Sequence, residues 1–335
     1  MRHTRGHAPI LAAAAKGDTG TVRALVLGAG ADPRAVQAVN NQGCTAVWLA
    51  ASHGHTTTVR ALVNECGADV NTANEDGMTP ILVAACQGHT ETVRALVKEC
   101  GADAKAADNT QGRTPVCIAA QNGHTETVRV LVQACGADAK AADKDGVSPV
   151  CIAAQNGHTE TVRALVLEFG ADASTTDKQG HTPVFLAVFH GRPETVRVLV
   201  LECGVDASTA NEWGMSLLHA AAAMDHTETV RILVQNGADP NTTSQWGTTP
   251  VSIAACYGCT RTVLSLVQEF DADPNKADNK GRTPICAAAE NGHAETVRCI
   301  EWLEGVQNPA RVSTLARRTA FTVPDEHQPS SRFCL

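Results

Sequence analysis

Aromatic residues are scarce in this chain of 335 residues. Phe, Trp and Tyr make up 3% of the sequence, with six phenylalanines, four tryptophans and a single tyrosine. Large rings dominate many hydrophobic cores because each of them buries so much surface. A core of that kind is excluded here, and the many Ala, Val and Leu residues indicate helices that approach one another closely.

The sequence also lacks long apolar runs and an excess of positive charge. No run approaches the roughly 18 residues of a membrane-spanning helix, and Ile10 to Ala15 is too short for the core of a signal peptide. The formal net charge of -8 disfavours a general attraction to nucleic-acid phosphates or to anionic membranes. We therefore expect no specific nucleic acid and no membrane insertion.

Motifs of catalysis are missing as well. The chain has no phosphate-binding loop, no H-E-x-x-H zinc motif, no nucleophile elbow and no kinase motif. We expect no enzymatic activity, no cofactor, no metal and no small-molecule substrate.

A repeat is what the sequence does contain. A glycine that follows a polar, turn-like segment recurs at intervals of 33 to 35 residues, at Gly43, Gly77, Gly112, Gly146, Gly180, Gly214, Gly247 and Gly281. The stretch VCIAAQNGHTETVR occurs twice without a change, beginning at Val116 and at Val150. Such periodicity indicates small units that bury their apolar faces by stacking on their neighbours.

Each unit reads as two helices followed by an extended loop or hairpin. In the unit that begins at Asn74, Thr79-Pro80 marks the start of a first helix that runs to about Gln87. A second helix begins at Thr90 and ends at Gly101-Ala102-Asp103. The signatures T-P-x-x-x-A-A, G-H and G-A-D in these units resemble the ankyrin repeat.

The resemblance covers about residues 8 to 304 and implies a fold and a function. The implied fold is an all-α ankyrin-repeat solenoid of about nine units, in which helix-turn-helix units stack and β-hairpin loops connect them. The implied function is a protein-protein interaction module or adaptor without turnover. Its partner would bind the concave surface that the hairpins and the exposed side of the first helices form.

The phase of the repeat divides the chain into three expected segments. Residues 1–40 form a degenerate capping unit with its connection, 41–304 the repeat array, and 305–335 a non-repeat tail. The tail is expected to be flexible in part, with a short capping helix from Asn308 to Arg318. Most units carry one extra residue at the end of the second helix, as in Lys98-Glu99-Cys100.

Cysteines recur in phase with the repeat, which favours packing over chemistry. One first-helix position holds Cys117, Cys151 and Cys286, and a position at the end of the second helix holds Cys66, Cys100, Cys135 and Cys203. A single C-x-x-C pair, Cys256 and Cys259, indicates packing rather than a metal or redox site. Thiols in repeat phase also fit a reducing compartment, so we expect an intracellular protein in the cytoplasm or the nucleus.

Histidines and arginines recur too, and both are interpreted as structural. For the histidines between the two helices, such as His89 and His124, the resemblance implies a structural hydrogen bond across the turn. In most units a glutamate precedes the recurring arginine by three residues, as in Glu91 and Arg94. That spacing favours ion pairs within the helix over a binding stripe for an acidic partner.

The units differ most in three successive hairpins and first helices. These segments carry His181, Phe189 and His190, then Trp213, Met215 and Met224, then Trp246 and Tyr257. Trp213 and Trp246 stand at matching positions before a turn glycine, and such residues together are typical of protein-binding hot spots. We predict that the main partner site lies between His181 and Tyr257. The competing interpretation is that each ring covers its own hairpin or the next one.

Two other functions stay open at this point. The chain would be a targeting or regulatory subunit, or a fragment, of a larger enzyme such as a ubiquitin ligase or a kinase if the catalytic part lies elsewhere. The 31 residues of the expected tail are too few for a catalytic domain. It would instead be a structural spacer or scaffold if substitutions in the aromatic cluster had no effect on any partner.

Overall fold

The computed structural model describes residues 8–29 and 33–307, so residues 308–335 of the predicted tail, with its capping helix from Asn308 to Arg318, lie outside the described residues. Within them all regular structure is helical, and the hairpins contain only the isolated bridges Val39↔Thr45 and Ala210↔Ser216. The prediction of an all-α repeat fold is therefore confirmed. The division at residues 40 and 304 stays a prediction, and the last described helix continues to Gln307.

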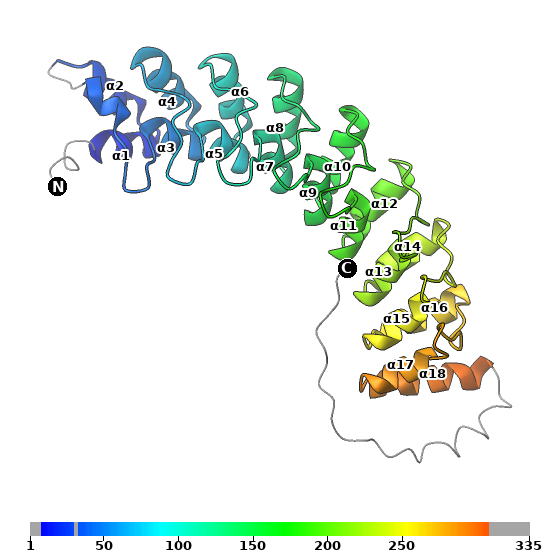
Figure 1. The fold of residues 1–335 in the computed structure, drawn as a ribbon. Helices are drawn as coiled ribbons and strands as arrows, with labels where there is room; N and C mark the ends of the chain where they lie inside the picture. The colour runs from blue at the N-terminus through cyan, green and yellow to red at the C-terminus, as the bar shows by residue number, and fades with distance from the viewer. Residues whose placement is uncertain (1–7, 30–32, 308–335) are drawn as a thin grey trace. The chain divides into compact units, whose positions relative to one another are not determined.

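The helices alternate between two layers (Figure 1). The first helices of the units are α1 (Ala8–Lys16), α3 (Ala46–Ser52), α5 (Pro80–Cys86), α7 (Pro115–Gln121), α9 (Pro149–Asn156), α11 (Pro183–Phe189), α13 (Leu217–Ala223), α15 (Pro250–Cys256) and α17 (Pro284–Glu290). The second helices are α2 (Thr19–Leu27), α4 with η2 (Thr56–Arg60, Ala61–Glu65), α6 (Thr90–Lys98), α8 with η3 (Thr125–Arg129, Val130–Ala134), α10 with η4 (Thr159–Arg163, Ala164–Glu168), α12 (Pro193–Leu201), α14 (Thr227–Gln235), α16 (Thr260–Phe270) and α18 (Ala294–Gln307). A short 3₁₀ helix, η1 (Pro33–Gln37), follows α2.

Contacts group the chain into two compact units. Unit 1 comprises Met1–Asn211, Ser216–Ala221 and Glu228–Asp239, and unit 2 comprises Glu212–Met215, Ala222–Thr227 and Pro240–Leu335. Within unit 1 each first helix packs on the next, from α1 to α11, and the second helices form the other layer. Within unit 2, α15 packs on α17 and α16 packs on α18. Both cores consist of small and branched aliphatic residues, in agreement with the scarcity of rings.

The extra residue at the end of the second helix widens its last turn. Backbone N–H groups there donate to the carbonyl five residues earlier, as Cys66 does to Ala61 and Cys135 does to Val130, both at 3.0 Å. These are π-type turns, which absorb one residue more than an α-helical turn. The predicted position of the insertion is thereby confirmed.

Ion pairs connect successive repeats from this widened turn. The predicted pairs within a helix are present, for example Glu91 with Arg94 at 3.5 Å. Shorter pairs link four of the recurring arginines to a glutamate of the next repeat, at 2.6 to 2.8 Å, in Arg23–Glu65, Arg60–Glu99, Arg129–Glu168 and Arg163–Glu202. Hydrogen bonds from these arginines lower the pKa values of the four glutamates. The inserted residue thus places a glutamate carboxylate within reach of the arginine of the preceding repeat. This pairing between repeats cannot be predicted from the spacing within one helix.

Buried threonines link the repeats a second time. Hydroxyl groups of successive second helices lie 2.7 to 2.9 Å apart in Thr19–Thr58, Thr56–Thr92, Thr90–Thr127, Thr125–Thr161, Thr159–Thr195, Thr227–Thr262 and Thr260–Thr296. The series is interrupted at Pro193, which stands where the other units have the first threonine of the pair. Proline has no hydroxyl group that could bond to Thr229. The buried Oγ1 of Thr229 consequently has no hydrogen-bond partner within the described residues.

Replacing these threonines with valine is expected to shift stability in opposite directions. Thr229→Val removes a buried, unpaired hydroxyl and should stabilise the fold by about 1 kcal/mol. Thr161→Val, at an equally buried site, breaks the 2.8 Å bond to Thr125 and should destabilise it by about 1 kcal/mol. Urea denaturation followed by circular dichroism, together with hydrogen exchange of the amides in α14 and α10, measures both effects. Shifts of the same sign in the two variants would contradict this account.

No helix in residues 8–29 and 33–307 has the length and apolar character needed to cross a membrane.

Candidate functional site

In unit 1, the predicted site residues belong to a row of rings on and beside α11. His181 stacks on Phe185 with ring centroids 4.9 Å apart, and Phe185 is followed by Phe189 at 6.0 Å. His190 meets Phe189 edge-on at 5.3 Å. The hairpin fixes the orientation of His181, because Nδ1 lies 3.1 Å from a carboxylate oxygen of Asp177. The structure thus joins three predicted residues through Phe185.

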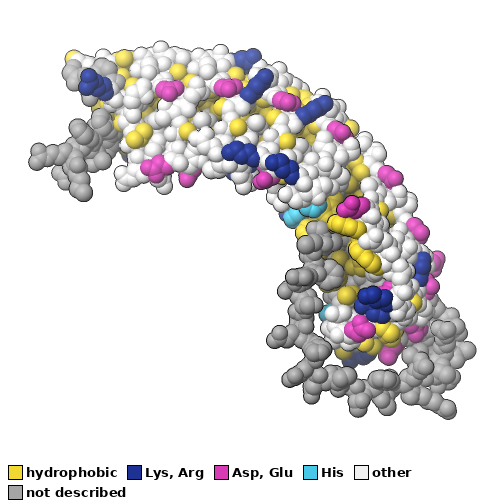
Figure 2. Space-filling model, viewed as in Figure 1, with side chains coloured by type: hydrophobic (Ala, Val, Ile, Leu, Met, Phe, Trp, Pro, Cys, Tyr) yellow, Lys and Arg dark blue, Asp and Glu magenta, His cyan; other side chains and the backbone are white. Residues whose placement is uncertain are grey.

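In unit 2, four of the five predicted aromatic and methionine side chains are exposed. The exposed fractions are 40% for Trp213, 39% for Met224, 52% for Trp246 and 43% for Tyr257, and Met215 is half-buried. Figure 2 shows hydrophobic side chains gathered on the surface near α15, with charged side chains at the margin. About half of the Trp246 side chain and less than half of the Trp213 side chain are therefore open to solvent.

The matching positions of the two tryptophans are visible in the backbone. Trp213 accepts a hydrogen bond from the N–H of Gln245 at 2.9 Å, and Trp246 accepts one from the N–H of Asn279 at 3.0 Å. Each hairpin tip is thereby bonded to the next. This bonding engages the backbone carbonyl groups of both tryptophans.

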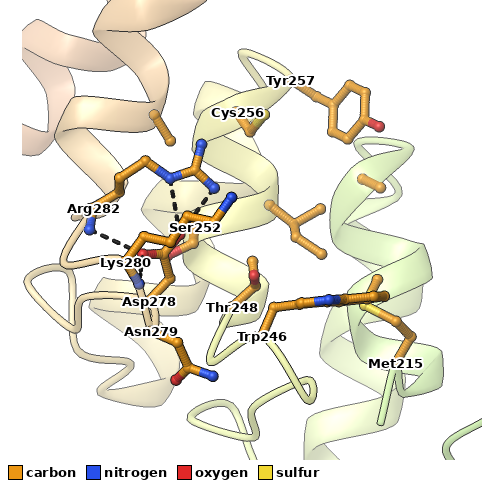
Figure 3. Close-up of a pocket in the computed structure, with 13 residues that line it drawn as sticks. Met215, Trp246, Thr248, Ser252, Cys256, Tyr257, Asp278, Asn279, Lys280 and Arg282 are labelled. Atoms are coloured by element: carbon orange, nitrogen blue, oxygen red, sulfur yellow. Dashed lines mark hydrogen bonds and ion pairs between the residues drawn. The ribbon is translucent and has the colours of Figure 1, made fainter. Parts of the chain in front are cut away.

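A pocket of about 370 Å³ lies beside Trp246 (Figure 3). It is lined by Met215, Ala223, Trp246, Thr248, Ser252, Ile253, Cys256, Tyr257, Asp278, Asn279, Lys280, Arg282 and Ala287. Figure 3 shows Trp246 next to Met215, and Tyr257 farther along the same side. The structure therefore brings three predicted site residues together around one cavity, whereas Trp213 and Met224 do not line it.

The opposite side of the pocket is polar and charged. Arg282 contacts a carboxylate oxygen of Asp278 at 2.9 Å and lies 3.7 Å from Glu290. Burial of the Asp278 carboxylate opposes its ionisation. Hydrogen bonds from the backbone N–H groups of Arg282 and Lys280 and from the Arg282 side chain outweigh that effect and lower the pKa of Asp278. Asp278 is therefore an anion at neutral pH, already engaged by Arg282.

Cysteines near the pocket have the environment of packing residues. Burial raises the pKa of Cys259 to about 11, so this thiol is protonated at neutral pH and is a poor nucleophile or metal ligand. No group of three or more His, Cys, Asp or Glu residues within the described ranges is arranged to hold a metal ion. The expected packing role needs one correction. Cys117 and Cys151 are buried as predicted, but Cys286, in the last described first helix, is exposed.

The histidines between the helices connect neighbouring repeats. Their Nε2 atoms lie 2.9 to 3.1 Å from a carbonyl oxygen of the preceding repeat, in His55–Ala15, His89–Ser52, His124–Cys86, His158–Gln121 and His293–Cys256. The resemblance implied a hydrogen bond across the histidine's own turn, and this prediction of the bonding partner is wrong. The structural role itself is present, and it links one repeat to the next.

Comparison with known families decides the classification of the chain. A family model described as ankyrin repeats (3 copies) matches residues 9–108, 66–143, 100–177, 117–211, 150–244, 186–278 and 218–303. The chain belongs to the ankyrin-repeat family. Ankyrin repeats are generally protein-protein interaction modules and are typically non-catalytic. A comparison with curated proteins found no match.

Several residues at or near the predicted sites in this ankyrin-repeat chain were missed by the site prediction. Lys280 precedes a turn glycine just as Trp213 and Trp246 do, so alignment of the hairpin tips would have revealed it. Phe185, in unit 1, occupies the first-helix position at which the ankyrin motif has histidine. Asp278 and Arg282 gave no such signal, because their role depends on the fold of the hairpin.

Proposed function

We propose that this ankyrin-repeat chain is a non-catalytic adaptor that binds a protein partner through hairpins and first helices between His181 and Tyr257. One observation carries the proposal, namely the exposure of Trp246 and Tyr257 around a pocket that Met215 completes. Aromatic and methionine side chains are enriched at the centres of protein interfaces. Trp213, in the same unit as Trp246, is also exposed. The ring row from His181 to His190, in unit 1, is the second group of side chains included in the proposal.

The proposed setting is the interior of the cell, in the cytoplasm or the nucleus. In support, all 12 cysteines within the described residues are free thiols, a state that reducing compartments maintain.

The proposal is tested by partner capture with Trp213→Ala/Trp246→Ala. Tagged wild-type chain and the double variant are incubated with extract of cells that express the protein, and the captured proteins are quantified by mass spectrometry. Because truncation of a hot-spot aromatic typically costs about 2 kcal/mol or more, the recovered partner should fall by at least roughly tenfold.

Trp302→Ala is the matched control for this experiment. Trp302 is 53% exposed, close to the 52% of Trp246, but it lies on α18 outside the proposed surface. This variant should capture the partner like the wild type. Circular dichroism establishes that all variants are folded. Undiminished capture by the folded double variant, or an equal loss in Trp302→Ala, would refute the proposed site.

A further inference from the structure

We propose that the pocket beside Trp246 receives one large apolar side chain, preferably aromatic, from an extended segment of the partner, and that an acidic residue next to that side chain pairs with Lys280. The inference rests on the proposed adaptor function and specifies the chemistry of the segment that is bound.

The apolar side of the pocket fits an aromatic anchor. Trp246, Met215 and Ile253 line it together with the ring of Tyr257, and an inserted ring would stack on or meet these rings edge-on. The volume of about 370 Å³ is at the small end of the range for ligand pockets. One side chain with its adjoining backbone therefore matches the cavity better than a folded element does.

The charged side of the pocket selects for an acidic neighbour. The charge of Arg282 is already shared between Asp278 and Glu290. Lys280 is exposed, lines the same pocket and has no carboxylate partner within the described residues. The side chain of Lys280 is thus a cationic contact at the pocket in a chain with a formal charge of -8. A carboxylate beside the anchor would be attracted to Lys280, although the chain as a whole carries a net negative charge.

The pocket is organised before any partner arrives. The hairpin beneath it is closed by the bond from Asp278 N–H to the Arg282 carbonyl at 2.9 Å, and it is tied to the previous hairpin through Asn279 and Trp246 at 3.0 Å. Little backbone ordering is then needed on binding, which favours recognition of a short segment. These bonds engage the backbone N–H groups of Asp278 and Asn279, so the proposed recognition depends on side chains.

Selection from a random peptide library displayed on phage tests the inference on the full chain. Enriched peptides are expected to share an aromatic or large aliphatic residue with Asp or Glu adjacent to it. The enriched peptides are then synthesised with a fluorescein label and titrated by fluorescence polarisation. Trp246→Ala and Lys280→Glu should each weaken binding by roughly tenfold or more. Added salt should weaken binding to the wild type but not to Lys280→Glu.

Two matched variants separate local from general effects. Trp302→Ala removes an equally exposed tryptophan elsewhere. Lys140→Glu reverses an exposed lysine in unit 1 and changes the net charge by the same amount. Both should bind the selected peptides like the wild type. Equal losses in Lys140→Glu and Lys280→Glu would overturn the specific pairing.

Other outcomes would overturn the inference while the adaptor function is judged separately by partner capture. Enriched peptides without an acidic neighbour, peptides that are indifferent to Trp246→Ala, or the absence of enriched peptides would each refute it. The inference would also be refuted if 3-phenylpropanoate bound as tightly as the peptides, since the pocket would then be a small-molecule site. In any of these cases, loss of the cellular partner by the tryptophan double variant would leave the proposed function standing. Retention of that partner would refute the proposed function as well.

Discussion

Gly123→Ala is expected to destabilise the chain by about 3 kcal/mol, whereas Gly136→Ala in the same repeat should cost only about 1 kcal/mol. Both glycines have a positive φ, of 74° and 71°, so alanine is strained at either position. A Cβ at Gly123 would lie 2.5 Å from Nδ1 of His158, while a Cβ at Gly136 would meet nothing within 4 Å. The difference between the two variants therefore measures the collision with the histidine of the next repeat.

A double-mutant cycle tests the cause of that difference. His158→Ala alone loses the hydrogen bond that Nε2 donates to the Gln121 carbonyl at 2.9 Å. Combined with Gly123→Ala, it also removes the ring that the new methyl group would strike. The double variant should therefore be more stable than the sum of the single effects predicts, by about 1 to 2 kcal/mol. Additive effects would show that the collision is relieved in another way.

The measurement has to be local, because repeats contact only their neighbours and a long array need not unfold as one unit. Hydrogen exchange of the amides in α8 and α10 should accelerate strongly in Gly123→Ala and weakly in Gly136→Ala. Exchange in α2 and α4 should remain at the wild-type rate. Uniform acceleration along the array would contradict a defect confined to one pair of repeats.

The helices of this protein are predictable from its sequence because their signals are local. Thr114-Pro115 marks the start of α7, and the Thr114 hydroxyl accepts a hydrogen bond from the backbone of Cys117, as expected for an N-cap. Contacts between repeats are harder to predict from the sequence. The pair Glu160–Arg163 follows from helical spacing, but the bond from Arg163 to Glu202 joins residues 39 positions apart. The period of the repeat identifies equivalent residues, but it does not predict which residues of neighbouring repeats are in contact.

The candidate site was predictable in composition but not in geometry. The exposed Trp246 and Tyr257 follow from their departure from the repeat pattern. The pocket that they share with Met215 depends on side-chain directions across two hairpins and a helix. Its polar wall depends on the fold of the hairpin around Asp278. Neither the pocket nor its polar wall can be predicted from the spacing of residues in the sequence.

Cys259→His is expected to destabilise unit 2 by about 2 to 3 kcal/mol, although histidine is the usual residue at this position of the repeat. Elsewhere the histidine packs over a glycine of the preceding repeat, as His293 does over Gly258. The residue that stands in the glycine position before Cys259 is Asp225, with a φ of 56°. The Asp225 side chain would lie where the ring must go. Cys259 instead fits there and bonds weakly to the Ala223 carbonyl at 3.6 Å.

Asp225→Gly should rescue this variant, because the two substitutions together restore the pair found in the other repeats. Alone, Asp225→Gly loses the 2.8 Å bond from the Thr262 hydroxyl but relieves an aspartate from the left-handed region, so its effect should lie within about 1 kcal/mol of zero. The double variant should then match or exceed the wild type in urea denaturation and in hydrogen exchange of α16. If Cys259→His is equally tolerated with Asp225 and with glycine, the two positions are not coupled. A coupling of the expected sign would mean that the residue in the histidine position and the residue in the glycine position of the preceding repeat have to fit each other in size. This requirement would then hold even where both residues have changed.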